Sequence, residues 1–141
     1  KWFFPIAIVL TILSTWLFEH FFNSDFTESA LVFNAYLLTL ASRMMFPQTL
    51  LIGRGHTRTV MNVGVMEIGL NVVLSLILVT QFGILGIAYA SVIAYAFEKV
   101  ALSIEVSRKL NISADQIIPF GSLLMWSALL IVAHLGAYFL Q

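Results

Sequence analysis

The chain has 141 residues, of which 60% are hydrophobic and 10% are charged, and its formal net charge is zero. A soluble domain typically has about 45–50% apolar and about 25% charged residues. This composition, with a mean hydropathy of +0.98, therefore excludes an ordinary soluble domain and indicates an integral membrane protein. The chain contains no cysteine, which excludes a disulfide framework and a thiolate metal site.

Five apolar segments follow one another along the chain, and each is long enough to cross a bilayer as a helix. About 20 residues at a rise of about 1.5 Å span a hydrocarbon core of about 30 Å. We therefore expect an all-α, polytopic transmembrane helix bundle that forms one unit. Because the chain begins with Lys1 and has no returning helix at its end, we expect it to be part of a larger protein. The predicted helices occupy about residues 2–22, 29–52, 59–79, 84–106 and 117–140.

The second apolar segment is interrupted by Arg43 and Pro47. A charge in the middle of a membrane helix costs about 2.5–3.5 kcal/mol on insertion scales. Pro47 cannot donate a backbone N–H, so the carbonyl of Arg43 loses its helical partner. The pair predicts a helix kink at Pro47 with polar groups facing a cavity. An alternative stays open, in which Arg43 only pairs with a carboxylate on a neighbouring helix.

A compact basic loop, Gly53–Arg58, follows the second segment and contains Arg54 and Arg58. Its expected role is to orient the protein and to attract anionic head groups. If the five predicted helices cross the membrane in turn, every Lys and Arg outside the helices lies on the same side as this loop. The positive-inside rule then places the loop in the cytoplasm. Residue 1 is expected inside and residue 141 outside. The cations that share the inner side are Lys1, Arg54, Arg58, Arg108 and Lys109.

The third segment carries Gly64, Glu67, Asn71 and Ser75 at spacings of three and four residues, hence on one helix face. A small and polar stripe of this kind packs against other helices or lines water. For Asn71 the favoured interpretation is an ordinary hydrogen bond between helices. For Glu67 it is a cavity position, because an unpaired carboxylate in lipid is costly unless it is protonated or hydrated.

A tight turn at Gln81–Gly86, with Gly83 and Gly86, leads into the fourth segment, which bears a ridge of small residues and Glu98. We interpret Glu98 as a cavity residue or a proton-linked switch, with an ion pair to Arg43 as the alternative. Lys99 points about 100° away from Glu98 on a helix, so the two are not expected to share a contact face. Lys99 is expected to snorkel to the inner surface.

The remaining polar residues give no sign of an enzyme. His134 has no metal-ligand neighbour at i+3 or i+4, so we expect a core or interfacial histidine and no metal site. No Ser/His/Asp or paired-carboxylate constellation stands out, and we expect no catalytic residue and no cofactor. Nucleic acid is not an expected partner.

Two stretches resemble a known family. The first is FPQTLLIG at Phe46–Gly53, followed after the basic loop by EIGLNVVLS at Glu67–Ser75. The second is FGILGIAYASVIAY at Phe82–Tyr95. Together they resemble the carboxyl-half signature of polysaccharide exporters and lipid-linked oligosaccharide flippases, in the MOP superfamily that also contains the MATE drug exporters and the lipid II flippase.

The resemblance implies a two-lobe transporter of the bacterial inner membrane, of which this chain supplies most of the second lobe. Such a transporter carries an undecaprenyl-pyrophosphate-linked glycan from the inner to the outer leaflet by alternating access. The implied partners are membrane lipid, this substrate and the remaining helices of the transporter. By position, the candidates for the substrate cavity are Arg43, Glu67, Asn71 and Glu98.

Other functions stay open at this point. A MATE-type drug or cation antiporter needs a smaller acidic cavity without a phosphate-binding cation, whereas Arg43 and the neutral charge balance favour a lipid-linked substrate. A membrane glycosyltransferase needs a large outer loop with catalytic carboxylates, and the Glu19–Glu28 connection is too short for one. A non-transporting structural bundle subunit predicts that every buried charge is paired.

Overall fold

The structure, a computed structural model, describes residues 3–21, 27–43, 46–112 and 120–139. Within these ranges the chain forms helices and no strands, which confirms the predicted all-α class. The helices are α1 (Phe3–Phe21), α2 (Thr27–Arg43), α3 (Pro47–Gly53), α4 (Thr57–Phe82), α5 (Ile84–Leu110) and α7 (Phe120–Phe139).

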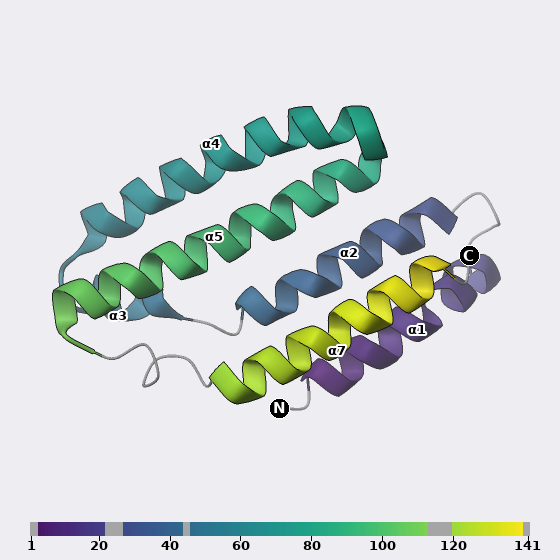
Figure 1. Cartoon of the computed structure of the whole chain (residues 1–141), viewed down its shortest axis with the longest axis horizontal. Coiled ribbons are helices and arrows are strands. Elements are labelled where there is room, and N and C mark those ends of the chain that lie inside the picture. Colours follow the sequence, from purple (N-terminus) through teal and green to yellow (C-terminus); the bar gives the residue numbers. More distant parts are fainter. Residues whose placement is uncertain (1–2, 22–26, 44–45, 113–119, 140–141) are drawn as a thin grey trace.

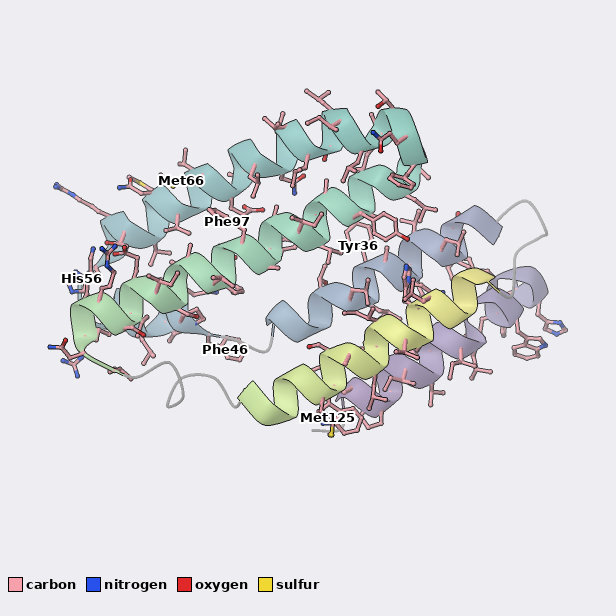
Figure 2. The ribbon with its side chains drawn as sticks, viewed as in Figure 1. Tyr36, Phe46, His56, Met66, Phe97 and Met125 are labelled. Atoms are coloured by element: carbon pink, nitrogen blue, oxygen red, sulfur yellow. The ribbon has the colours of Figure 1, made fainter. Side chains whose placement is uncertain are left out.

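Helix α5 is the centre of the arrangement. It packs against α4, α3 and α2, and α2 packs in turn against α1 and α7, which also contact each other. Figure 1 shows α4, α5 and α2 side by side, with α1 and α7 on the side of α2 away from α5. Helix α4 therefore lies at one edge of the described bundle, and its outer face carries exposed apolar side chains such as Met66 (Figure 2).

The buried apolar side chains form two separate clusters. One lies where α3, α4 and α5 meet and consists of Leu51, Val63, Leu102 and Val106. The other joins α1 to α7 and consists of Phe4, Ala7 and Leu130, and it is extended by a ring stack of Phe4 on Trp126 with centroids 5.8 Å apart. The α4–α5 hairpin and the α1–α2–α7 group are thus packed around different cores.

The turn between α4 and α5 is tighter than predicted, because α4 continues to Phe82 and α5 begins at Ile84. Gly83 alone connects them, at φ 58°, a backbone conformation that favours glycine. Gly86 lies so close to α4 that a Cβ atom added to it would be 2.2 Å from the carbonyl oxygen of Leu78. Both glycines of the predicted turn are therefore required by the geometry, Gly83 for its dihedral angle and Gly86 for its lack of a side chain.

By length and composition, α4 and α5 are the helices in the described residues that could cross a membrane alone. The described parts of the other long helices contain shorter apolar stretches, Phe4–Ser14, Ser29–Thr39 and Met125–Gly136. The five-helix count accordingly stays a prediction.

The predicted kink at Pro47 is instead the start of a separate helix. Helix α2 ends at Arg43, and α3 begins at Pro47 after Phe46 at φ −119° and ψ 44°. Proline disfavours the helical conformation in the residue before it, and its missing N–H costs nothing in the first turn of a new helix. The predicted basic loop is also shorter, because Arg58 belongs to the first turn of α4. The side chain of Arg43 lies outside the described part of the chain.

Candidate functional site

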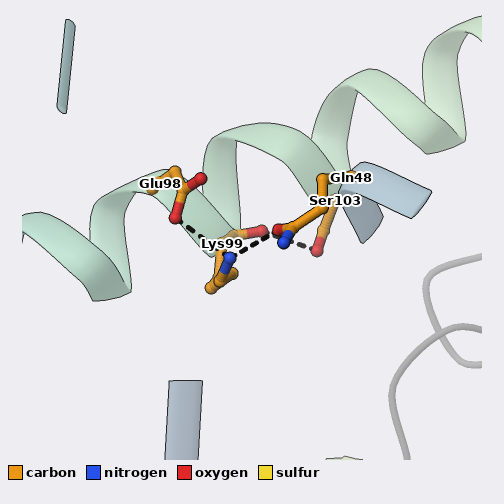
Figure 3. A network of polar contacts seen from close by, with 4 residues as sticks. All are labelled: Gln48, Glu98, Lys99 and Ser103. Atoms are coloured by element: carbon orange, nitrogen blue, oxygen red, sulfur yellow. Dashed lines mark hydrogen bonds and ion pairs between the residues drawn. The ribbon is translucent and has the colours of Figure 1, made fainter. Parts of the chain in front are cut away.

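Lys99 and Glu98 form an ion pair in the middle part of α5. Lys99 Nζ lies 3.0 Å from Glu98 Oε2, and the two side chains are 9% and 18% exposed (Figure 3). The sequence placed these neighbours on different faces of the helix, and the ion pair joins them in spite of that. Their Cβ atoms do point about 100° apart, but the four-carbon stem of lysine is long and flexible enough to bring the ammonium back to the carboxylate.

Two further groups complete this polar cluster. Lys99 Nζ donates a hydrogen bond of 2.5 Å to Gln48 Oε1 on α3, and Ser103 Oγ donates one of 2.7 Å to the backbone carbonyl of Lys99. Gln48 is in position because α3 begins one residue earlier, at Pro47. Lys99 is buried rather than snorkelling to the surface, because its ammonium finds an anion and an amide oxygen inside the bundle.

The depth of the cluster follows from the helix geometry. Lys99 lies ten residues before Lys109 on α5, which places it about 15 Å from that end of the helix. By length and composition α5 could cross a membrane, and a span over α5 would enclose the ion pair. An ammonium there is tolerated because it is paired and hydrogen-bonded, since buried charges without partners are costly.

Asn71 makes a second polar contact between α4 and α5. Its Nδ2 donates to Ser91 Oγ at 3.4 Å, and its Oδ1 accepts a hydrogen bond of 3.1 Å from Ser75 Oγ. Ser91 Oγ donates in turn to the carbonyl of Ile87 at 3.1 Å. Asn71 therefore has the interhelical hydrogen bond that the sequence favoured.

Glu67 lies on the same face of α4 as Asn71, and its side chain is half-buried. Among the described residues it has no hydrogen-bond or ion-pair partner. Away from the helix ends, the α4–α5 pair contains the carboxylates of Glu67 and Glu98 and the ammonium of Lys99, whereas Glu105 lies near the end of α5. We refer to Gln48, Glu67, Asn71, Glu98 and Lys99 below as the polar seam.

His134 connects α7 to α5. Its Nε2 lies 3.0 Å from Tyr89 Oη, and the two rings meet edge to face with centroids 5.8 Å apart. Its side chain is buried, as expected for a core histidine. In the residues that the structure describes, no group of three His, Cys, Asp or Glu residues could hold a metal ion.

A group of exposed cations lies where α4 begins and α5 ends, in contrast to the buried ammonium of Lys99. Arg54 and Arg58 are both exposed. Lys109 Nζ contacts Thr59 Oγ1 and lies 3.4 Å from Glu105 Oε2, while Arg108 Nη1 lies 3.8 Å from Glu105 Oε1. These contacts bring the start of α4 and the end of α5 together.

Sequence reasoning missed Gln48 and Ser91 as partners and misjudged Lys99. A signal for Gln48 exists in the sequence, because a polar residue directly after a helix-starting proline lies in the first turn of the new helix. The pairing of Gln48 with Lys99 has no such signal, since 51 residues separate them.

A family model described as lipid II flippase MurJ matches residues 2–141. The chain belongs to the lipid II flippase family. No curated protein and no solved structure matched it. Membership of this flippase family supports a membrane role in the transport of a lipid-linked precursor and is consistent with the prediction that the chain is not an enzyme. The predicted superfamily and the lipid-linked class of substrate are supported, whereas the family match does not support specificity for polysaccharide export.

Proposed function

We propose that this chain forms part of a translocation pathway that carries lipid II, an undecaprenyl-pyrophosphate-linked glycan, from the inner to the outer leaflet of the bacterial inner membrane by alternating access. The observation that carries the proposal is the match of the lipid II flippase family model to residues 2–141. The match favours a lipid-linked substrate over the small cation of a drug antiporter.

The polar seam is the proposed wall of this pathway. Ionisable residues within membrane spans face bundle interiors or water-filled cavities and mark substrate and ion routes. Glu67, Glu98 and Lys99 are such residues, and all three lie on the two helices that are long enough to span. The hydrogen bond of 3.4 Å from Asn71 Nδ2 to Ser91 Oγ joins α4 to α5, the two helices that form the proposed wall.

Lys99 has the chemistry to meet the substrate's pyrophosphate. Its charge is matched by Glu98 at 3.0 Å, and the pyrophosphate group competes for the ammonium because its two phosphates together carry two negative charges against the one of a carboxylate. In this proposal the arriving phosphate takes Lys99 from Glu98, and Glu98 takes it back when the substrate leaves. Arg43 is the proposed second cation for the pyrophosphate, Glu67 is a proposed cavity carboxylate, and Glu98 is the proposed proton-linked switch.

Single and double variants of the ion pair test this role. Lipid II flipping is measured with the intact protein, at matched protein levels, for Glu98→Gln, Lys99→Met and the neutral double variant E98Q/K99M. The double variant removes the pair without leaving an unpaired charge, so it is expected to fold and to lose most flipping. Wild-type flipping by E98Q/K99M would show that the pair only holds the bundle, as in a structural subunit. Arg43→Ala and Glu67→Gln are tested in the same way.

The proposed orientation has its own test. With the basic Gly53–Arg58 loop inside, a cysteine introduced at Ser24 is expected to react with an impermeant reagent added outside intact cells, whereas one at His56 is expected to stay unlabelled. The reverse pattern would overturn the orientation and leave the flipping proposal untouched.

A further inference from the structure

Four exposed cations from two distant stretches of sequence meet at one end of the α4–α5 hairpin. Arg54 and Arg58 flank the turn between α3 and α4, and Arg108 and Lys109 lie in the last turn of α5. The contact of Lys109 with Thr59 joins the two stretches. We call Arg54, Arg58, Arg108 and Lys109 the basic end; His56, labelled in Figure 2, lies in the turn between the first two.

The positive charge of the basic end is only partly compensated within the described residues. Glu105 is the carboxylate that pairs with it, and it serves both Arg108 and Lys109. Arg54 and Arg58 have no carboxylate partner in the part of the chain that the structure describes. The Arg108 side chain stays 74% exposed in spite of its ion pair. A net positive surface of this kind attracts anions.

An apolar surface adjoins these cations. Helix α3 packs between α4 and α5 through Leu51, which is fully buried, while Leu50 and Ile52 on the same helix are 40% and 51% exposed. Phe46, directly before α3, is 61% exposed (Figure 2). The short helix therefore presents apolar side chains next to Arg54. A soluble phosphate would use only the cations, whereas a phospholipid would use both surfaces.

If α4 and α5 span the membrane, the basic end lies at the depth of the lipid head groups. Helix α4 begins and α5 ends there, and both are long enough to cross a membrane. We propose that the basic end, with Leu50 and Ile52, is a binding surface for anionic phospholipids, whose phosphates contact the arginines and whose acyl chains cover α3. This surface is separate from the polar seam, so the inference goes beyond the proposed function.

Lipid retention by the intact purified protein tests the inference without any transport step. Delipidated protein is given dioleoyl phosphatidylglycerol or dioleoyl phosphatidylcholine, which share their acyl chains, and bound lipid is measured by native mass spectrometry. Each juxtamembrane arginine contributes about fivefold to anionic-lipid binding. Arg54→Gln is therefore expected to weaken phosphatidylglycerol binding about fivefold, and R54Q/R58Q about 25-fold, with phosphatidylcholine unchanged. The matched control R54K/R58K keeps the charge and should stay within about twofold of wild type.

Three results would overturn the proposal. Unchanged phosphatidylglycerol retention by R54Q/R58Q would show that the surface binds no lipid or is covered by other parts of the protein. Equal losses of both lipids would show a general defect in packing. Full displacement of phosphatidylglycerol by millimolar pyrophosphate would show an anion site without a lipid role. Leu50→Ser supports the proposal if it weakens phosphatidylglycerol binding while R54K/R58K does not. An unchanged phosphatidylglycerol affinity of Leu50→Ser would contradict the proposed contact between the acyl chains and α3.

Discussion

The α4–α5 hairpin and the α1–α2–α7 group use their polar side chains in opposite ways. In the hairpin, Asn71 and Lys99 bond to residues on other helices, Ser91 and Gln48. In the other group the buried hydroxyls of α1 bond to their own backbone, as in the hydrogen bond of 2.9 Å from Thr11 Oγ1 to the carbonyl of Ala7. The described contacts that join its helices include the aromatic pairs Phe4–Trp126 and Phe18–Phe33, and a polar contact of this group with the hairpin is that of His134 with Tyr89.

The difference separates two ways of holding membrane helices together. Aromatic contacts such as that of Phe18 with Phe33, with centroids 5.8 Å apart, need no polar partner. Polar groups between helices add hydrogen bonds but create a path that water or a charged substrate can follow. The hairpin is accordingly the part of the described chain in which we place transport, and the α1–α2–α7 group the part that supports it. Four substitutions test the contrast.

Gly86→Ala is expected to have the largest effect. Its Cβ would lie 2.2 Å from the carbonyl oxygen of Leu78, so the backbones of α4 and α5 must separate, at a cost of about 3 kcal/mol or more. Thermal unfolding in detergent measures the loss. Gly64→Ala is the matched control, because a Cβ there meets nothing within 4 Å and a helical alanine gains about 0.5–1 kcal/mol. Equal stability of the two variants would refute the close approach of Gly86 on α5 to the backbone of α4 at Leu78.

Lys99→Met comes next, with an expected loss of about 3 kcal/mol, because it leaves the carboxylate of Glu98 enclosed without its partner. The neutral variant E98Q/K99M should recover most of this stability, since it leaves no unpaired charge. The same unfolding experiment at constant pH measures both. If E98Q/K99M is as unstable as Lys99→Met, the loss comes from packing and not from charge.

Asn71→Leu is expected to cost about 1 kcal/mol, within the range measured for hydrogen bonds between membrane helices, because it removes the contacts with Ser91 and Ser75. The loss is measured by thermal unfolding. Val73→Leu on the exposed face of α4 serves as the control and should leave stability unchanged. No loss for Asn71→Leu would mean that this contact contributes nothing to holding the hairpin.

Thr11→Val should have the smallest effect, about 0.5 kcal/mol or less, although Thr11 is almost fully buried. Among the described residues its hydroxyl bonds to the carbonyl of Ala7 in the same helix and to no other group, and that carbonyl keeps its helical N–H partner after the change. Thermal unfolding of Thr11→Val and Asn71→Leu in one series measures whether a bond within a helix contributes less stability than a bond between helices. A loss for Thr11→Val as large as that for Asn71→Leu would remove the distinction between the two regions.

The sequence by itself determined the membrane class, the helical fold and the α4–α5 hairpin. Apolar length and composition are properties of local stretches, so four of the five predicted segments end within a few residues of the observed helices, whereas the predicted segment 29–52 is divided into α2 and α3. The same holds for Gly83 and Gly86, because a one-residue turn between long helices requires residues without a side chain. The stripe of Glu67 and Asn71 followed from helical periodicity alone.

Tertiary structure decided which polar groups meet. The helical wheel separates Lys99 from Glu98 by direction, but a long side chain in an apolar surrounding turns to the nearest anion, because an unpaired ammonium there is costly. Pro47 could bend one helix or begin another, and only the packing of α3 against α4 and α5 selected the second. The joining of Arg54 and Arg58 to Arg108 and Lys109 also depends on the fold, since about 50 residues separate the stretches. Local patterns fix elements, whereas partners far apart in sequence are set by how the elements pack.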